Sequence, residues 1–161
     1  MLRRRWWWVG LVGIILAGVG AGCSGGGDDT NGRPASSGCV LVGEQEPNAT
    51  LLTAQFLGEL FVDDCVGVAG SLFDPLDVDS YRVLIQESLR LVVTVDHSPF
   101  VDFDLQLFDA DTGQLILDCG LSVVPEVCVV PFVVRSRDIA VDIVVTSVVG
   151  AGTYTLTLDA Q

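Results

Sequence analysis

Two aspartates and the single histidine are the residues best suited to acid–base chemistry in this chain. Asp102 and Asp104 lie two residues apart in an alternating apolar–polar segment. A strand would place both carboxylates on one face, as an acid–base or glycosidase pair requires. The same spacing is typical of the solvated face of an amphipathic strand, and His97 lies in a predicted surface turn without a Gly-X-Ser-X-Gly element. We therefore expect no enzyme; a hydrolase using these residues is the alternative.

The first 22 residues have the organisation of a bacterial export signal. Three arginines at positions 3–5 precede an apolar stretch from residue 6 to 19, and small residues at 20–22 are followed by Cys23. This pattern resembles the signal of bacterial lipoproteins, which implies cleavage before Cys23 and lipidation of its thiol. An uncleaved membrane anchor is the alternative, although the glycines weaken its helix. Ser24 resembles the residue found in lipoproteins sorted to an outer membrane.

The mature chain would be strongly acidic. The full chain has 8 basic and 21 acidic residues, and loss of the three leader arginines changes its formal charge from −13 to −16. Such a surface repels phosphate backbones and anionic lipid headgroups. We expect no nucleic-acid partner, a membrane contact made through the lipid anchor, and a protein or polymer ligand for the folded part.

Four further cysteines are available for disulfide bonds, which are usual in exported proteins. Cys119 and Cys128 lie near facing ends of two predicted strands, so we favour a bond between them among the three possible pairings. Cys39–Cys65 would then tie the N-terminus of the domain to an early strand. A four-cysteine zinc site is the alternative, but no Cys-X-X-Cys spacing supports it.

The rest of the chain divides into a linker and one domain. Residues 24–38 are rich in Gly, Ser and Asp and have no apolar face, so residues 23–38 are predicted to be a lipidated cysteine followed by a flexible tether. Residues 39–161 are long enough for a single domain with its own core.

Short strand-like segments follow one another through residues 39–161. They are rich in β-branched residues or alternate with a period of two, and turn residues separate them. The predicted strands span 66–72, 80–86, 90–96, 103–108, 114–117, 127–134, 139–146 and 153–158. Pro131 predicts an edge strand or a bulge, and residues 49–56 are predicted to form a short helix. The pattern predicts an all-β, single β-sandwich or jelly-roll-like domain of about eight antiparallel strands.

Four motifs resemble, in order, those of the bacterial pre-peptidase C-terminal (PPC) domain, a β-sandwich often appended to secreted proteases. They are Glu46-Pro47-Asn48 followed by Ala54, Gly70-Ser71-Leu72 with Asp77-Val78-Asp79-Ser80-Tyr81, the segment 102–109, and the segment 152–158. Together they cover nearly all of residues 44–159. The resemblance implies a PPC-like β-sandwich for residues 39–161.

The same resemblance implies a candidate calcium site, because some PPC domains bind calcium near these motifs. The matching residues are Glu44, Glu46, Asn48, Asp74, Asp77 and Asp79. Calcium takes six to eight oxygen ligands, and an extended backbone would point the first three residues to one side. In the alternative reading, Asn48 caps the short helix and the aspartates form solvated turns. No other cofactor is expected.

These observations predict a non-catalytic, lipid-anchored protein of the bacterial cell envelope. Its β-sandwich would serve as an interaction or adhesion module. A calcium-stabilised structural domain, or an accessory domain to a secreted protease, is the alternative.

Overall fold

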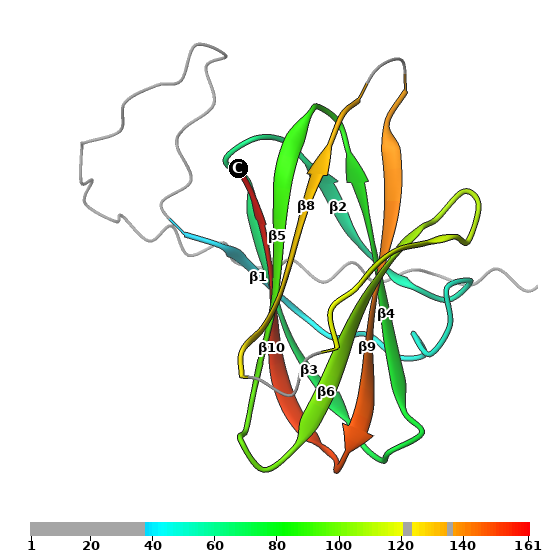
Figure 1. Cartoon of the computed structure of the whole chain (residues 1–161), viewed down its shortest axis with the longest axis vertical. Coiled ribbons are helices and arrows are strands. Elements are labelled where there is room, and N and C mark those ends of the chain that lie inside the picture. The colour runs from blue at the N-terminus through cyan, green and yellow to red at the C-terminus, as the bar shows by residue number, and fades with distance from the viewer. Residues whose placement is uncertain (1–37, 121–123, 135–136) are drawn as a thin grey trace, which may run out of the picture.

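The computed structural model describes residues 38–120, 124–134 and 137–161, which form ten strands (Figure 1). The strands are β1 (Val40–Gly43), β2 (Gln55–Leu60), β3 (Cys65–Leu72), β4 (Val78–Ile85), β5 (Leu89–His97), β6 (Asp102–Asp109), β7 (Leu115–Asp118), β8 (Glu126–Phe132), β9 (Ile139–Val149) and β10 (Gly152–Ala160). None of the described residues forms a helix that could span a membrane. The predicted leader, Cys23 and the tether up to residue 37 lie outside the described residues.

The strands form two five-stranded sheets that pack face to face (Figure 1). The first sheet has the order β1-β3-β10-β5-β8 and the second has the order β2-β4-β9-β6-β7. This arrangement confirms the predicted all-β sandwich. Two details of the prediction are wrong: the described residues form ten strands, and β1 pairs with β3, and β2 with β4, in parallel. All other strand pairs are antiparallel.

The core lies between the sheets, where alternate side chains of each strand point inward. In β5 every second residue from Leu89 to His97 is buried, and β8 follows the same alternation. The period-two pattern of the sequence thus corresponds to one buried face of each sheet, as expected for a sandwich. Pro131 lies in β8, which is an edge strand, as predicted.

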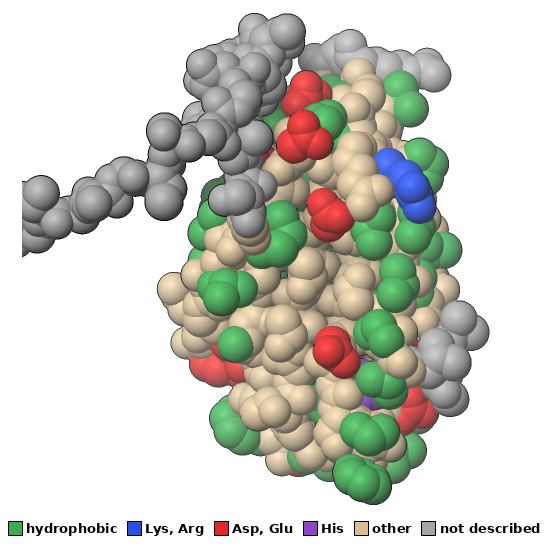
Figure 2. Space-filling view, turned by 90° about the vertical axis from the view of Figure 1, so that its left-hand side faces the viewer, with side chains coloured by type: hydrophobic (Ala, Val, Ile, Leu, Met, Phe, Trp, Pro, Cys, Tyr) green, Lys and Arg blue, Asp and Glu red, His purple; other side chains and the backbone are tan. Residues whose placement is uncertain are grey.

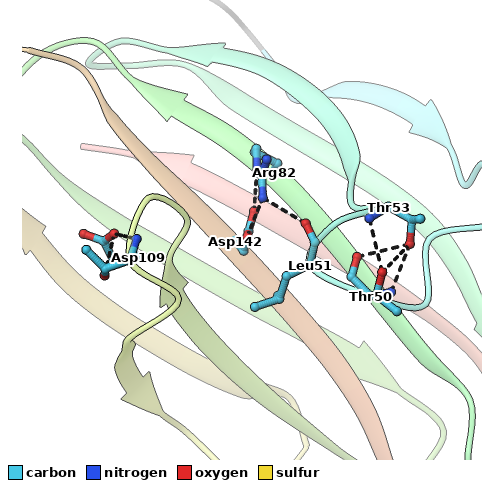
Figure 3. A network of polar contacts seen from close by, with 7 residues as sticks. Thr50, Leu51, Thr53, Arg82, Asp109 and Asp142 are labelled. Carbon is cyan, nitrogen blue, oxygen red and sulfur yellow. Dashed lines mark hydrogen bonds and ion pairs between the residues drawn. The ribbon is translucent and has the colours of Figure 1, made fainter.

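The predicted helix at residues 49–56 is wrong. Residues 50–53 form a turn in which the hydroxyls of Thr50 and Thr53 lie 2.8 Å apart (Figure 3). Arg82 of β4 donates a 2.9 Å hydrogen bond to the Leu51 carbonyl, and β2 begins at Gln55. The segment makes its backbone hydrogen bonds to β4 and to Arg82 instead of within a helix. These tertiary contacts override its local helical propensity.

Both predicted disulfides are present. Cys39–Cys65 joins the start of β1 to the start of β3, and Cys119–Cys128 joins the end of β7 to β8. Because β7 and β8 are edge strands of different sheets, the second bond links the two layers on one side of the sandwich. The zinc alternative therefore does not hold, and the two bonds are characteristic of an extracytoplasmic protein.

Candidate functional site

Four of the six predicted calcium ligands converge where the chain crosses from the first sheet to the second. The carboxylate oxygens of Glu44, Glu46 and Asp79 lie within 4.8 Å of one another. Asn48 is fully buried beside them, with an exposed fraction of 0%. The site joins the segment that follows β1 to the first residues of β4.

Backbone contacts hold the crossing segment against both sheets. Glu44 accepts a 3.0 Å hydrogen bond from the Ser71 N–H of β3, and the Ser80 N–H of β4 donates to the Asn48 carbonyl at 2.9 Å. The side chain of Gln55 in β2 adds a 2.9 Å hydrogen bond to the Gly43 carbonyl. The alternating spacing of Glu44, Glu46 and Asn48 thus brings all three into one site, because the segment is fixed at both ends.

The amide of Asn48 faces two carboxylates. In one orientation its Oδ1 lies 3.1 Å from Asp79 Oδ1 and 2.9 Å from Glu46 Oε2, while its nitrogen lies 3.5 Å from Glu44 Oε1. This orientation sets three acceptor oxygens against one another, which is unfavourable unless a cation such as calcium lies between them. In the other orientation the amide nitrogen donates to both carboxylates. The site thus offers either a set of oxygen ligands or a closed hydrogen-bond network.

A series of short contacts continues from this site into the core. Asp79 and Tyr154 lie 2.5 Å apart, the hydroxyls of Tyr154 and Tyr81 lie 2.6 Å apart, and Tyr81 lies 2.9 Å from Glu44 Oε1. Two tyrosine protons can fill only two of these three contacts. The third contact requires a proton on a carboxyl group.

The burial of Asp79 accounts for that proton. Burial, together with the neighbouring Glu44, raises the pKa of Asp79 from an ordinary value of 3.8 to about 8, although the Tyr154 hydroxyl acts in the opposite direction. Burial also raises the pKa of Tyr81 and Tyr154 above the ordinary tyrosine value, so both hydroxyls stay protonated. At neutral pH and without a cation, Asp79 therefore carries the proton that completes the series.

The other two predicted ligands, Asp74 and Asp77, act within a turn instead. Asp77 accepts a 2.7 Å hydrogen bond from the Phe73 N–H, and Asp74 accepts one of 2.7 Å from the Leu76 N–H. Neither belongs to the close group of carboxylates formed by Glu44, Glu46 and Asp79. The alternative prediction, that these aspartates form turns, describes Asp74 and Asp77 correctly.

The structure adds Tyr81, Tyr154 and the Ser71 backbone to the candidate site. Period-two alternation in the segments around both tyrosines places them in the core, where both are buried. The sequence carries no signal for the contact between their hydroxyls, because that contact depends on how the two sheets are stacked.

A second group of acids lies at β6 and β8. The carboxylates of Asp102, Asp104 and Glu126 lie within 4.8 Å of one another, and Glu126 is fully buried. Burial raises the pKa of Asp104, and the negative charges of Asp102 and Asp118 raise it further. Asp102 and Asp104 are half-buried, so the expectation that they form a solvated strand face is only partly correct.

His97 is the last residue of β5 and is 8% exposed, so its predicted place in a surface turn is wrong. It is buried because the inward alternation of β5 extends to this residue. Its ring centroid lies 5.0 Å from that of Phe103, and its Nδ1 lies 2.9 Å from the Ser98 carbonyl oxygen. Within the part of the chain that the structure describes, no serine hydroxyl or carboxylate is recorded as a hydrogen-bond partner of His97.

A groove of about 580 Å³ lies beside the candidate site, on the outer side of β3, β10 and β5. Glu44 and Tyr154 line one part of it, and Ser71 and Asp96 line another. Because the half-buried Glu44 lines this groove, the groove adjoins the candidate site.

Comparisons with known proteins support the fold. No protein-family model matches the sequence, and no curated protein matches it significantly. The structure is similar to the pre-peptidase C-terminal domain of a collagenase from Bacillus anthracis, with a TM-score of 0.53, 14% identity and coverage of 73% of this chain and 100% of that chain. A periplasmic inhibitor of g-type lysozyme from Aeromonas hydrophila is also similar, with a TM-score of 0.50, 12% identity and coverage of 67% and 97%, respectively. The chain therefore folds as a PPC-like β-sandwich.

Proposed function

We propose that the protein is a non-catalytic, lipid-anchored component of a bacterial cell envelope, and that its β-sandwich is an interaction or adhesion module. The observation that carries this proposal is the placement of the two ends of the domain. Gly38, Cys39, Cys65 and the C-terminal Gln161 line one hollow at one end. β3 runs from Cys65 at that end to Leu72 at the other, where three turns lie together (Figure 1).

This placement suits a module held by its N-terminal tether. A chain anchored through Cys23 would enter the domain at Gly38 and leave the three turns at the far end facing outward. The two similar structures are the pre-peptidase C-terminal domain of a collagenase and a periplasmic inhibitor of g-type lysozyme. The role of the inhibitor supports binding as the work of this sandwich.

Anchoring is tested by fractionating cells that express the chain with and without globomycin, which blocks removal of lipoprotein signals. We expect the protein in the membrane fraction, and we expect globomycin to cause accumulation of a larger precursor. Cys23→Ala should abolish lipid attachment, whereas Ser24→Ala should leave it intact. An unmodified N-terminus in the mass spectrum of the wild-type protein would contradict the anchor.

A second candidate function is a calcium-stabilised structural domain, such as an accessory domain to a secreted protease. The specific observation that favours it is the group of carboxylates from Glu44, Glu46 and Asp79, whose ligand atoms lie within 4.8 Å of one another beside the buried Asn48. Bound calcium would tie the segment 44–48 to β4. Isothermal titration with calcium tests this function, with magnesium as the comparison ion, and the absence of any calcium heat would contradict it.

A further inference from the structure

Three turns meet at the end of the sandwich opposite to Cys39. We call them the distal turns; they connect β3 to β4 (residues 73–77), β5 to β6 (98–101) and β9 to β10 (150–151). Cross-strand pairs hold them together, because Gly152 pairs with Leu72 and Asp102 pairs with Val149. A Cβ atom at Gly150 would lie 2.9 Å from Val101 Cγ1, which shows how closely two of the turns approach.

Large apolar side chains project from this end into solvent. Leu76 is 91% exposed and Phe100 is 90% exposed. Phe73, Val148 and Val149 are also exposed. Figure 2 shows hydrophobic side chains gathered at the lower end of the molecule. Single exposed apolar residues are common, but a group contributed by adjacent turns is typical of an interaction surface.

Hydrogen bonds fix the backbone of the turns that carry these side chains. In the first turn, Asp77 and Asp74 accept the N–H groups of Phe73 and Leu76, each at 2.7 Å. In the second turn, the Val101 N–H donates to the Ser98 carbonyl at 3.2 Å. Ordered turns lose little conformational freedom on binding, which favours affinity.

The charge of the distal turns restricts the kind of partner. Asp74 and Asp77 lie in the first turn, Asp102 follows the second, and none of the three turns contains Lys or Arg. Carboxylates around an apolar centre attract a cationic rim and repel anionic lipid headgroups. A second copy of the chain would bring the same acids face to face, which disfavours self-association through this end.

We propose that the distal turns dock into an apolar groove of a protein partner whose rim carries Lys or Arg. Leu76 and Phe100 insert into the groove, and Asp74 and Asp102 face the cationic rim. This inference rests on the proposed interaction module and assigns its binding surface. Buried aromatic and aliphatic anchors surrounded by a polar rim are the usual organisation of such an interface.

Short random peptides displayed on phage provide the test, with the full chain as the immobilised target. We expect the selected peptides to combine aromatic or aliphatic residues with Lys or Arg, and their binding to weaken as salt increases. The double variant L76S/F100S should weaken their binding by at least about tenfold. The matched control is L52S/F56S, which replaces an exposed leucine and an exposed phenylalanine outside the distal turns and should leave binding unchanged.

Several outcomes would overturn the docking surface. One is a selection that yields no peptides, or only peptides without Lys or Arg. Another is that the selected peptides bind L76S/F100S and L52S/F56S equally well. The last is that the chain binds phosphatidylcholine vesicles but no peptide, with the vesicle binding lost in L76S/F100S. Circular dichroism melting checks the fold of each variant, and F73S replaces L76S/F100S if the latter does not fold. If both double variants bound the peptides equally, the distal turns would not be the binding surface, but the protein would still be an interaction module. The fractionation experiment separately tests whether that module is anchored.

Discussion

Asp79 of β4 and Tyr154 of β10 lie 2.5 Å apart and connect the two sheets through a polar contact inside the core. Tyr81 extends the connection to Glu44 in the segment that follows β1. At this point hydrogen bonds as well as apolar packing thus join the two sheets. This contact also links the candidate cation site to the folding stability of the domain.

Removing the Tyr154 hydroxyl should therefore destabilise the domain. Tyr154→Phe keeps the ring, which packs against Gly70, but leaves the buried Asp79 without this partner. We expect a loss of about 1–3 kcal/mol in the free energy of unfolding, measured by urea denaturation. Tyr81→Phe should also destabilise, and the double variant should cost less than the sum because both tyrosines serve one network. Full additivity would contradict a shared network.

The stability of the calcium-free protein should depend on pH through Asp79. Its pKa is about 8 in the folded state and near the ordinary 3.8 when unfolded, so the folded state retains a proton that the unfolded state releases. The contribution of Asp79 is fully present below about pH 4 and is lost as the pH rises towards 8. Its slope is at most about 1.4 kcal/mol per pH unit.

The measurement compares wild type with Asp79→Asn between pH 4 and 8 in chelator. Asparagine stays neutral, so the stability of the variant relative to wild type should increase as the pH rises. Asp159→Asn changes an aspartate of β10 far from the site and should follow the wild-type curve. A constant difference between wild type and Asp79→Asn would show that Asp79 does not hold the proton.

Calcium should stabilise the domain through the same residues. A ligand that binds only the native state raises its stability by RT ln(1 + [L]/Kd), so about 100-fold excess over Kd adds about 2.7 kcal/mol. Asn48→Ala and Asp79→Asn should remove most of the rise in melting temperature. Because calcium replaces the proton of Asp79, its affinity should increase with pH up to about 8.

The control for calcium lies in the second group of acids. Asp102→Asn changes the cluster at β6 and β8, which contains none of the candidate ligands, and should keep the calcium-dependent rise. If Asp102→Asn removed the rise and Asp79→Asn did not, the cation would bind at the other cluster.

Of the two ion pairs described in the structure, Arg82–Asp142 should contribute more to the free energy of unfolding. Arg82 Nε lies 2.6 Å from Asp142 Oδ1 and Nη2 lies 2.7 Å from Oδ2, while the Asp142 side chain is 1% exposed (Figure 3). Arg82→Ala leaves this carboxylate buried without its partner. Since Arg82 is itself 34% exposed, we expect a loss of about 2–3 kcal/mol in thermal or urea unfolding.

The exposed pair Arg137–Asp111 provides the comparison. Its N–O distance is also 2.6 Å, but the two side chains are 74% and 45% exposed. Arg137→Ala should cost less than about 1 kcal/mol because water screens the pair. Equal losses for the two arginine variants would show that burial does not decide the strength of these pairs.

Much of the sandwich follows from sequence periodicity. Strands β5, β6 and β10 alternate apolar and polar residues, and their predicted bounds differ from the observed ones by one or two residues. Strands β1 and β2 were not predicted. β1 has only four residues, and β2 is interrupted at Gly58, which has a φ of 121° and lies at a shift in the strand register.

The candidate site could be predicted only in part. The alternation of Glu44, Glu46 and Asn48 indicates that their side chains point to the same side of the backbone. Asp79 lies next to them because β4 begins beside the crossing segment. Asp77 lies only two residues from Asp79, yet its carboxylate turns back to the Phe73 backbone. Local hydrogen bonds decide such orientations, and sequence spacing does not report them.

The Cys39–Cys65 bond decides how the domain would respond to mechanical load applied at its N-terminus. Without it, tension would reach β1 first, a four-residue edge strand that can be peeled away from its neighbour. The bond passes tension directly to β3, which is hydrogen-bonded on both sides. A domain held in flowing liquid by this terminus would therefore resist unzipping from the edge.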